Sequence, residues 1–158
     1  MRLIEKKSTL GIIIGTRNIF NAQLASVQRK KLLAVLDALD ISYVIPDENA
    51  TTAGAIETRE DAKKCAELFK ANRDAIDGVV IALPNFGDEL GIIETLKVAQ
   101  LDVPVLVQAC NDDIDAVDVN SRRDAFCGKL SVCNNLYQHG IPFTDTLEHT
   151  CDVDGESF

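Results

Sequence analysis

The sequence predicts an α/β fold, a flavodoxin-like three-layer sandwich around a central parallel sheet of four to five strands. Two observations lead to this prediction. Short apolar runs alternate along the chain with stretches whose apolar residues recur every three or four positions, which is typical of strands joined by helices. The chain has 158 residues, enough to bury a core as one unit. We therefore expect a single α/β domain over residues 1–144.

Five apolar segments are the candidate strands. They are Leu10–Ile14, Ile41–Ile45, Gly78–Leu83, Val103–Gln108 and a weaker fifth, Ile141–Thr144. Parallel strands that are covered on both faces have such nearly continuous apolar runs. We expect the spatial order 2-1-3-4-5, which is common among sheets built from β-α-β units.

The segments between the strands carry four apolar stripes with helical spacing. The stripes are Leu32, Val35, Leu36 and Leu39; Ala62, Cys65, Ala66 and Phe69; Ile92, Ile93, Leu96 and Ala99; and Phe126, Leu130, Cys133 and Tyr137. Two pairs have the spacing of a helix N-cap followed by an acid: Thr58 with Asp61, and Ser121 with Asp124. These pairs predict helix starts near residues 59 and 122.

The net charge of −9 comes from two short segments. Residues 111–118 hold four acids and residues 144–158 hold five, and neither segment contains Lys or Arg, so the acids and bases of the remaining chain balance. A protein without a basic stripe is a poor partner for nucleic acid or for an anionic membrane surface. We therefore expect neither partner.

Five cysteines are scattered along the chain without a C-x-x-C pair. An odd, scattered set favours reduced thiols over a disulfide framework or a zinc site. The first residues show no apolar signal-peptide segment, and the apolar runs are too short to cross a bilayer. These features predict a cytoplasmic location. We expect Cys127 and Cys133 to face the core, because free cysteine behaves as a small hydrophobic residue.

The C-terminal segment, residues 145–158, differs from the rest of the chain. It is acidic and has almost no apolar periodicity. Segments of this composition bury little surface. We interpret it as an acidic tail or a truncated linker, and we expect it to be mobile.

Polar residues follow the first and third strands. "GTRNIF" ends the first, and "PNFGDE" ends the third. In an open parallel sheet, ligands bind outside the carboxyl ends of the strands where the chain order reverses. The two loops should therefore meet at one crevice. The candidate substrate-binding residues there are Arg17, Asn18, Phe20, Asn85, Phe86 and Asp88.

Arginine and asparagine can hydrogen-bond hydroxyl groups, and a phenylalanine ring can cover the apolar face of a sugar. Two further residues could complete the rim, namely Gln108 at the end of the fourth strand and Arg122 near the start of the fourth helix. Purely structural roles are equally compatible with the pattern: Asp88 could cap the third helix and Phe86 could pack beneath it. One arginine of the pair Arg122 and Arg123 could bind Asp124 while the other is solvated.

Four stretches of the chain form a combined pattern: "GIIIGTRNIF", "EDAKKCAELFKANRDAIDGVVIALPNFGDE", "LDVPVLVQAC" and "SRRDAFCGKLSVCNNLYQHGIPFT". Together they resemble the N-terminal domain of the L-fucose isomerase / L-arabinose isomerase-like family. The resemblance covers nearly the whole chain. It implies part of an oligomeric enzyme that interconverts aldoses and ketoses with manganese or another divalent metal.

The resemblance also bears on the site residues. It implies that the loop at Arg17 to Phe20 reaches the sugar of a neighbouring subunit, and that the segments at 85–86 and 122–126 line the same cleft. The Gln, Tyr and His types that arabinose isomerases carry in these loops are missing here. The family's metal ligands and proton-transferring carboxylates belong to later domains. We therefore expect no catalytic residue and no cofactor site in this chain, with the remaining isomerase domains and a monosaccharide as its partners.

A second interpretation remains open. The segment "DGVVIALPN" also resembles one lobe of the sugar-binding proteins of the periplasmic and repressor types. Such a lobe would bind sugar without isomerising it.

Overall fold

The computed structural model describes residues 7–158 and contains a five-stranded, all-parallel sheet in the order β2-β1-β3-β4-β5. The strands are β1 (Thr9–Ile14), β2 (Ser42–Val44), β3 (Gly78–Leu83), β4 (Val105–Ala109) and β5 (Thr144–Asp145). The predicted fold class and strand order are confirmed. β3 has the predicted bounds, and the ends of β1, β2 and β4 differ from the prediction by one or two residues.

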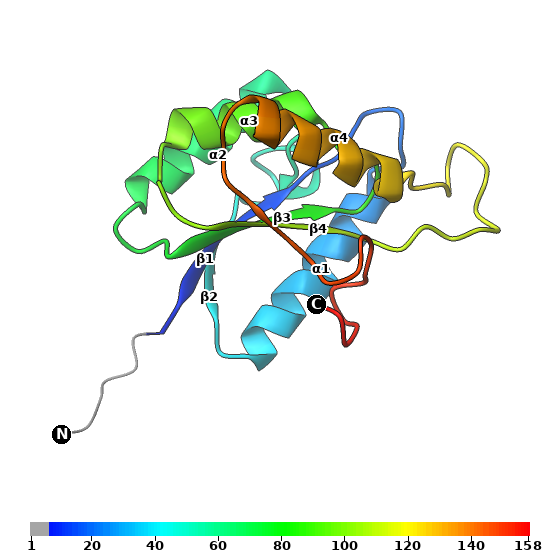
Figure 1. Ribbon diagram of the computed structural model, residues 1–158, viewed down its shortest axis with the longest axis horizontal. Helices are drawn as coiled ribbons and strands as arrows, with labels where there is room; N and C mark the ends of the chain where they lie inside the picture. Colours follow the sequence, from blue (N-terminus) through cyan, green and yellow to red (C-terminus); the bar gives the residue numbers. More distant parts are fainter. Residues whose placement is uncertain (1–6) are drawn as a thin grey trace.

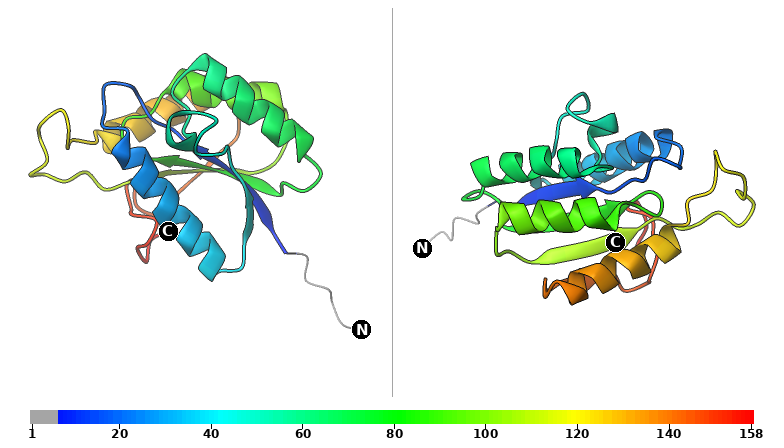
Figure 2. Two further views of the ribbon diagram at one scale, coloured as in Figure 1. Left: turned by 180° about the vertical axis from the view of Figure 1, so that it is seen from behind. Right: turned by 90° about the horizontal axis from the view of Figure 1, so that it is seen from above.

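Helices cover both faces of the sheet. They are α1 (Gln23–Ala38), α2 (Arg59–Ala71), α3 (Glu89–Ala99) and α4 (Ala125–Gln138), with a short 3-10 helix, η1 (Thr52–Gly54), between β2 and α2. α2, α3 and α4 lie on one face, and α1 lies on the other (Figures 1 and 2). Among residues 7–158, none of these helices is long and apolar enough to cross a membrane.

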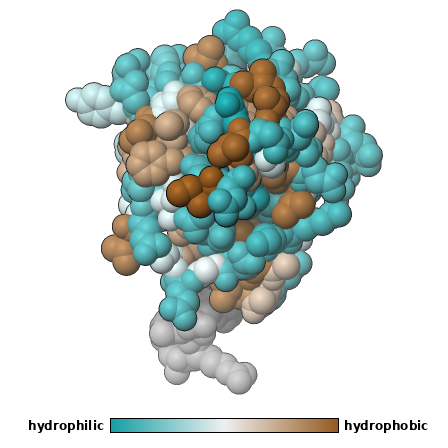
Figure 3. Space-filling view, turned by 90° about the vertical axis from the view of Figure 1, so that its right-hand side faces the viewer, coloured by the Kyte–Doolittle hydropathy of each residue, from teal (hydrophilic) through white to brown (hydrophobic). Residues whose placement is uncertain are grey.

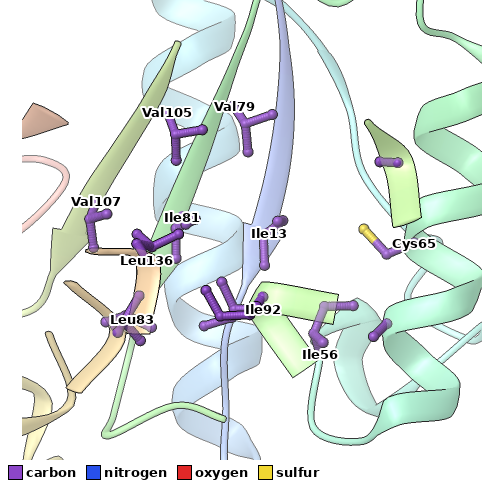
Figure 4. Packing of buried hydrophobic residues seen from close by; sticks show 14 of the residues in the cluster. Ile13, Ile56, Cys65, Val79, Ile81, Leu83, Ile92, Val105, Val107 and Leu136 are labelled. Atoms are coloured by element: carbon purple, nitrogen blue, oxygen red, sulfur yellow. The ribbon is translucent and has the colours of Figure 1, made fainter. Parts of the chain in front are cut away.

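The sheet separates two hydrophobic cores. Ile13, Ile81 and Val107 point towards α2, α3 and α4, where they pack with Ile92 and Leu136 (Figure 4). On the opposite face, alternate residues such as Ile12, Ile14 and Val80 pack against α1. This alternation follows from the two-residue period of a strand, and it explains why β3 is apolar and buried throughout.

α2 begins where its cap predicts. The Thr58 hydroxyl accepts a hydrogen bond from the Asp61 N–H (3.1 Å), and the Asp61 carboxylate accepts one from the Thr58 N–H (3.0 Å). This reciprocal capping box satisfies N–H groups that have no partner inside the helix. The stripes predicted for α2 and α3 face the core, whereas Leu39 of the first stripe lies beyond α1 and is 63% exposed.

α4 begins three residues later than predicted. Asp124 has a left-handed backbone (φ 52°) and makes no side-chain cap, while the Ser121 hydroxyl bonds to Asp118. The capping carboxylate is Asp112, which accepts hydrogen bonds from the N–H groups of Ala125 and Phe126, both at 2.9 Å. The cap comes from the preceding loop, so a local sequence pattern could not identify it. Arg122 consequently precedes the helix.

The stripe predicted for α4 is on the wrong face. Phe126, Leu130 and Tyr137 are 49%, 53% and 81% exposed. The buried face is the neighbouring one, formed by Ala125, Gly128, Lys129, Val132 and Leu136. Its small residues allow close packing, because a Cβ at Gly128 would lie only 2.1 Å from the Phe86 carbonyl oxygen. The large apolar residues therefore point outward. Cys127, predicted to face the core, is also exposed, and Cys133 is half-buried.

The fifth strand is shorter and later than predicted, at Thr144–Asp145 instead of 141–144. Pro142 lies inside the predicted segment and has no N–H to donate to a neighbouring strand. The strand is held by Lys129 of α4, whose side chain is fully buried. Its ammonium donates to the Thr146 hydroxyl (2.6 Å) and forms an ion pair with Asp145.

Residues 151–158 pack on the same face of the sheet as α1. Cys151 and Val153 are buried, and Phe158 contacts the α1 core. The Cys151 N–H donates to the Ala109 carbonyl (2.9 Å) at the end of β4. The expectation that this segment would bury little surface does not hold for Cys151 and Val153, which are buried although acids flank them. The mobility of the segment and its role as a linker stay predictions.

The two partners of the Lys129–Asp145 ion pair should contribute unequally to stability, because the Lys129 side chain is buried and Asp145 is partly exposed. Asp145→Ala leaves a buried ammonium without its counter-ion and should lower the free energy of unfolding by roughly 2–3 kcal/mol. Lys129→Met leaves a carboxylate that water can solvate, so it should cost less than about 1 kcal/mol. Urea unfolding of both variants measures the difference. Asp154→Ala, in the exposed Lys31–Asp154 pair, is the control and should change stability little. Equal losses for Asp145→Ala and Lys129→Met would contradict the asymmetry.

The close approach of α4 gives a second prediction. Gly128→Ala forces a Cβ into the backbone at Phe86 and should cost about 1–3 kcal/mol of unfolding free energy. Gly78→Ala is the matched control. Its Cβ would meet its nearest neighbour at 3.4 Å, an ordinary contact, and the change should stay within about 0.5 kcal/mol. Thermal unfolding of the two variants tests this, and comparable melting temperatures would show that α4 can move away at little cost.

Candidate functional site

The loops after β1 and β3 lie side by side at the carboxyl end of the sheet. Asn85 connects them: its Nδ2 donates to the Thr16 hydroxyl at 2.8 Å, and its Oδ1 accepts from the Gly87 N–H at 3.0 Å. Asn85 is fully buried. Gly87 has a left-handed backbone (φ 76°), and an added Cβ there would lie 2.8 Å from the Leu83 side chain. The predicted adjacency of the two loops is confirmed.

Arg17 and Phe86 form the first contact across this crevice. The guanidinium carbon of Arg17 lies 4.5 Å from the centre of the Phe86 ring. The same guanidinium forms an ion pair with Glu89, in the first turn of α3. The side chains of Arg17 and Glu89 are 31% and 21% exposed. The guanidinium therefore has its face on an aromatic ring and one N–H group on a carboxylate.

Arg122 and Phe20 form a second contact of the same kind. The guanidinium carbon of Arg122 lies 5.7 Å from the centre of the Phe20 ring, and its Nη2 is 3.3 Å from an oxygen of Asp124. The next residue, Arg123, donates from Nη1 to the Pro84 carbonyl at 2.9 Å, which connects the loop after β4 to the loop after β3. Three loops are thus joined at this end of the sheet. We call Arg17, Phe86, Arg122 and Phe20 the arginine–phenylalanine rim.

The predicted site residues Asn18, Phe20 and Asp88 differ in how exposed they are. Asn18 is exposed, whereas Phe20 is 7% exposed and presents little surface to a ligand. Asp88 caps α3, accepting from the Gly91 N–H at 2.8 Å. Burial raises the pKa of Asp88, and the hydrogen bond from the Gly91 N–H acts in the opposite direction.

Gln108 lies inside the protein, away from the rim contacts. Its Oε1 accepts from Gln28 of α1 (3.0 Å), and its Nε2 donates to the Cys151 carbonyl (2.6 Å). The thiol of Cys110 donates to Gln28 Oε1 at 2.9 Å, and burial raises the pKa of this thiol to about 11. At neutral pH the thiol is therefore protonated and weakly nucleophilic.

Two residues with roles at the site were absent from the sequence-based set. Glu89 neutralises Arg17, and Asp112 fixes the start of α4 beside Arg122. Glu89 belongs to the quoted loop "PNFGDE", which the strand order places beside the first loop, but it was not predicted to contact substrate. Asp112 gives no local signal, because its partners lie thirteen or more residues later.

The carboxyl end of the sheet also exposes apolar side chains. The loop between β4 and α4 presents Ile114, Val117 and Val119, which are 90%, 76% and 64% exposed. Figure 3 shows this end of the molecule, where apolar side chains lie among polar ones.

The surface also has two pockets, and the second of them includes Asp88 in its lining. A pocket of about 620 Å³ lies beside Pro104 and Pro142, towards the amino ends of β3 and β4. A second, of about 540 Å³, follows α3 between Thr58 and His139. Within residues 7–158, His, Cys, Asp and Glu side chains form no group of three or more that could hold a metal ion. The rim can offer a ligand hydrogen bonds and the half-buried Phe86 ring, and the described residues offer no metal-ligand set.

Comparison with known proteins identifies the family. Residues 11–158 match the family described as fucose/sulfoquinovose isomerase, N-terminal domain. No curated protein sequence gives a significant match. The family match includes β1 from Gly11 onward, the other four strands, all four helices and every residue of the arginine–phenylalanine rim. The chain therefore belongs to the family of fucose/sulfoquinovose isomerase N-terminal domains.

Proposed function

We propose that this domain forms part of the substrate rim and of the subunit contacts of a metal-dependent aldose–ketose isomerase of the L-fucose/L-arabinose type. The observation that carries the proposal is the arginine–phenylalanine rim, at the point of the sheet where α/β proteins bind ligands. Membership of the isomerase N-terminal family supports it. The same membership favours an isomerase domain over the lobe of a sugar-binding protein.

The chemistry of the rim suits a monosaccharide. Arg17 and Arg122 are partly exposed, so N–H groups that do not face a carboxylate can donate to sugar hydroxyls. Phe86 is half-buried and can lie against the apolar face of a sugar ring. Asn18, which is exposed, adds an amide donor and acceptor. Together these groups would orient the sugar, leaving proton transfer to other residues.

The implied metal ion does not fit the residues described here, since they supply no donor set. In the complete enzyme, manganese or another divalent metal would be held by other domains and would polarise the sugar oxygens. We assign substrate contact to this domain and no metal ligand. We further propose a cytoplasmic location, with which the free state of all five cysteines agrees.

Subunit contact is proposed through α4. Phe126, Leu130 and Tyr137 recur along one exposed face of this helix, and the His149 ring packs on Phe126 with ring centres 4.3 Å apart. A row of large apolar residues on the outer face of a helix is costly in water and typical of protein interfaces. The neighbouring surface in the oligomer would be that of another subunit.

The first functional prediction concerns Arg17. In the complete enzyme, Arg17→Ala should raise KM for the sugar or lower kcat/KM by about 10- to 100-fold, since a hydrogen bond from a charged group contributes roughly 1.5–3 kcal/mol. Arg17→Lys keeps the charge but loses the planar stacking, so its effect should be intermediate. Metal affinity should not change, because Arg17 would touch sugar only.

Steady-state kinetics and metal titration test this prediction. Arg59→Ala is the matched control: Arg59 also pairs with a glutamate, Glu94, but its side chain is 78% exposed on α2. Arg59→Ala should leave the kinetic constants for the sugar and the metal affinity unchanged. Arg17→Ala kinetics equal to those of the unsubstituted enzyme would refute the proposed substrate contact.

The second functional prediction concerns α4. Leu130→Glu places a charge in the proposed contact and should reduce the mass of the oligomer, measured by light scattering after size exclusion. Leu39→Glu is the control, because Leu39 has similar exposure (63% against 53%) but follows α1 on the opposite face of the sheet. An unchanged oligomer mass for Leu130→Glu would show that α4 does not form the subunit interface.

A further inference from the structure

Arg29 is a buried cation on the side of the molecule opposite α4. It projects from α1 beneath the loop of residues 46–54, which follows β2, and it is only 7% exposed. The loop closes tightly over it: an added Cβ at Gly54 would lie 2.4 Å from Arg29 Nη1 and 2.8 Å from the Pro46 carbonyl oxygen. Gly54 is therefore the residue that makes room for the guanidinium.

The guanidinium has unused hydrogen-bond donors. Among the described residues, its buried Nε and Nη1 atoms have no hydrogen-bond partner. The carboxylate of Glu48 is 4.0 Å from Nε, beyond hydrogen-bond distance, and its side chain is 61% exposed. Asp47 forms no hydrogen bond with Arg29: its Oδ1 accepts from the Asn49 N–H (2.8 Å) and from Asn49 Nδ2 (3.1 Å). These hydrogen bonds lower the pKa of Asp47, and the charge of Arg29 adds to the lowering.

The same loop contains another unused polar group. The Thr51 hydroxyl is buried without a hydrogen-bond partner. A second cation, Lys64 of α2, reaches the loop and donates from Nζ to the Ala50 carbonyl at 3.1 Å. Unpaired donors of a buried charged group are costly, and native structures satisfy them with protein, water or a ligand. The donors present here are those that bind an oxyanion.

We propose that Arg29 and the 46–54 loop form a binding site for a small tetrahedral oxyanion, the phosphate group of a free ion or of a phosphate ester. Arg29 donates to the oxyanion through Nε and Nη1, and the Thr51 hydroxyl donates a further hydrogen bond. Since these atoms are buried, the loop must open to admit the ligand. Ala53, with a left-handed backbone (φ 56°) that alanine rarely adopts, marks a strained point at which it can do so.

Removing the charge of Glu48 distinguishes an anion-binding site from an internal ion pair between Arg29 and Glu48. If Arg29 receives an external anion, Glu48 is a competing negative charge at the edge of the site. Removing that charge should strengthen anion binding. If Glu48 is instead the resident partner of Arg29, removing it should destabilise the protein without affecting anion binding.

The experiment follows thermal unfolding of the full chain with increasing inorganic phosphate, against sodium chloride at equal ionic strength. A saturable rise in melting temperature is expected, in contrast to the non-saturating stabilisation that phosphate gives to many proteins. Glu48→Gln should lower the apparent Kd several-fold, and Arg29→Gln should abolish the saturable part. Lys30→Gln, at an exposed neighbour on α1, is the control and should leave it unchanged.

Thr51→Val provides a second variant if Arg29→Gln fails to fold, and it should weaken phosphate binding several-fold. Glucose 6-phosphate in place of phosphate distinguishes the two sources: tighter binding of the ester indicates a phosphorylated metabolite, and tighter binding of phosphate indicates the free ion. The absence of a saturable shift would overturn the proposal. So would a Glu48→Gln variant with a lower melting temperature and an unchanged response to phosphate.

Discussion

The buried hydrogen bond between Asn85 and Thr16 is the contact on which the rim depends. It joins the loops after β1 and β3 at the point where the strand order reverses, and the same side chain holds the Gly87 turn. A buried amide must satisfy its polar atoms inside the protein, so neither loop can move away without leaving unpaired groups. Asn85, one of the residues predicted to bind substrate, therefore fixes the positions of the two loops that carry Arg17 and Phe86.

Packing from α4 adds a second constraint. Gly128 brings the helix against the backbone of Phe86, and Arg123 joins the loop before the helix to Pro84. Each rim guanidinium is then held between an aromatic face and a carboxylate. These contacts leave each arginine ordered and only partly exposed, which is the state in which a polar group recognises a ligand with little loss of entropy on binding. Because the small residues of α4 face the sheet, Phe126, Leu130 and Tyr137 point outward and are exposed.

The fold and part of the site could be predicted from the sequence, because those features have local signals. Apolar runs identified the strands, the Thr58–Asp61 pair identified the start of α2, and the strand order placed two polar loops together. The failures share one cause, which is contact between distant segments. Asp112 caps α4 from another loop, Gly128 selects which face of α4 is buried, and the acidic C-terminal segment packs through Cys151 and Val153. Composition and periodicity contain no information about such partners.

A crystal structure of the complete protein with a bound open-chain polyol, an analogue of the sugar, would show whether the arginine–phenylalanine rim touches substrate. We expect the Arg17 guanidinium or the Asn18 amide to lie within hydrogen-bond distance of a polyol hydroxyl, with the Phe86 ring beside the carbon chain and no metal ligand from this domain. If the polyol binds elsewhere and the loops after β1 and β3 face solvent, the domain does not form part of the substrate rim.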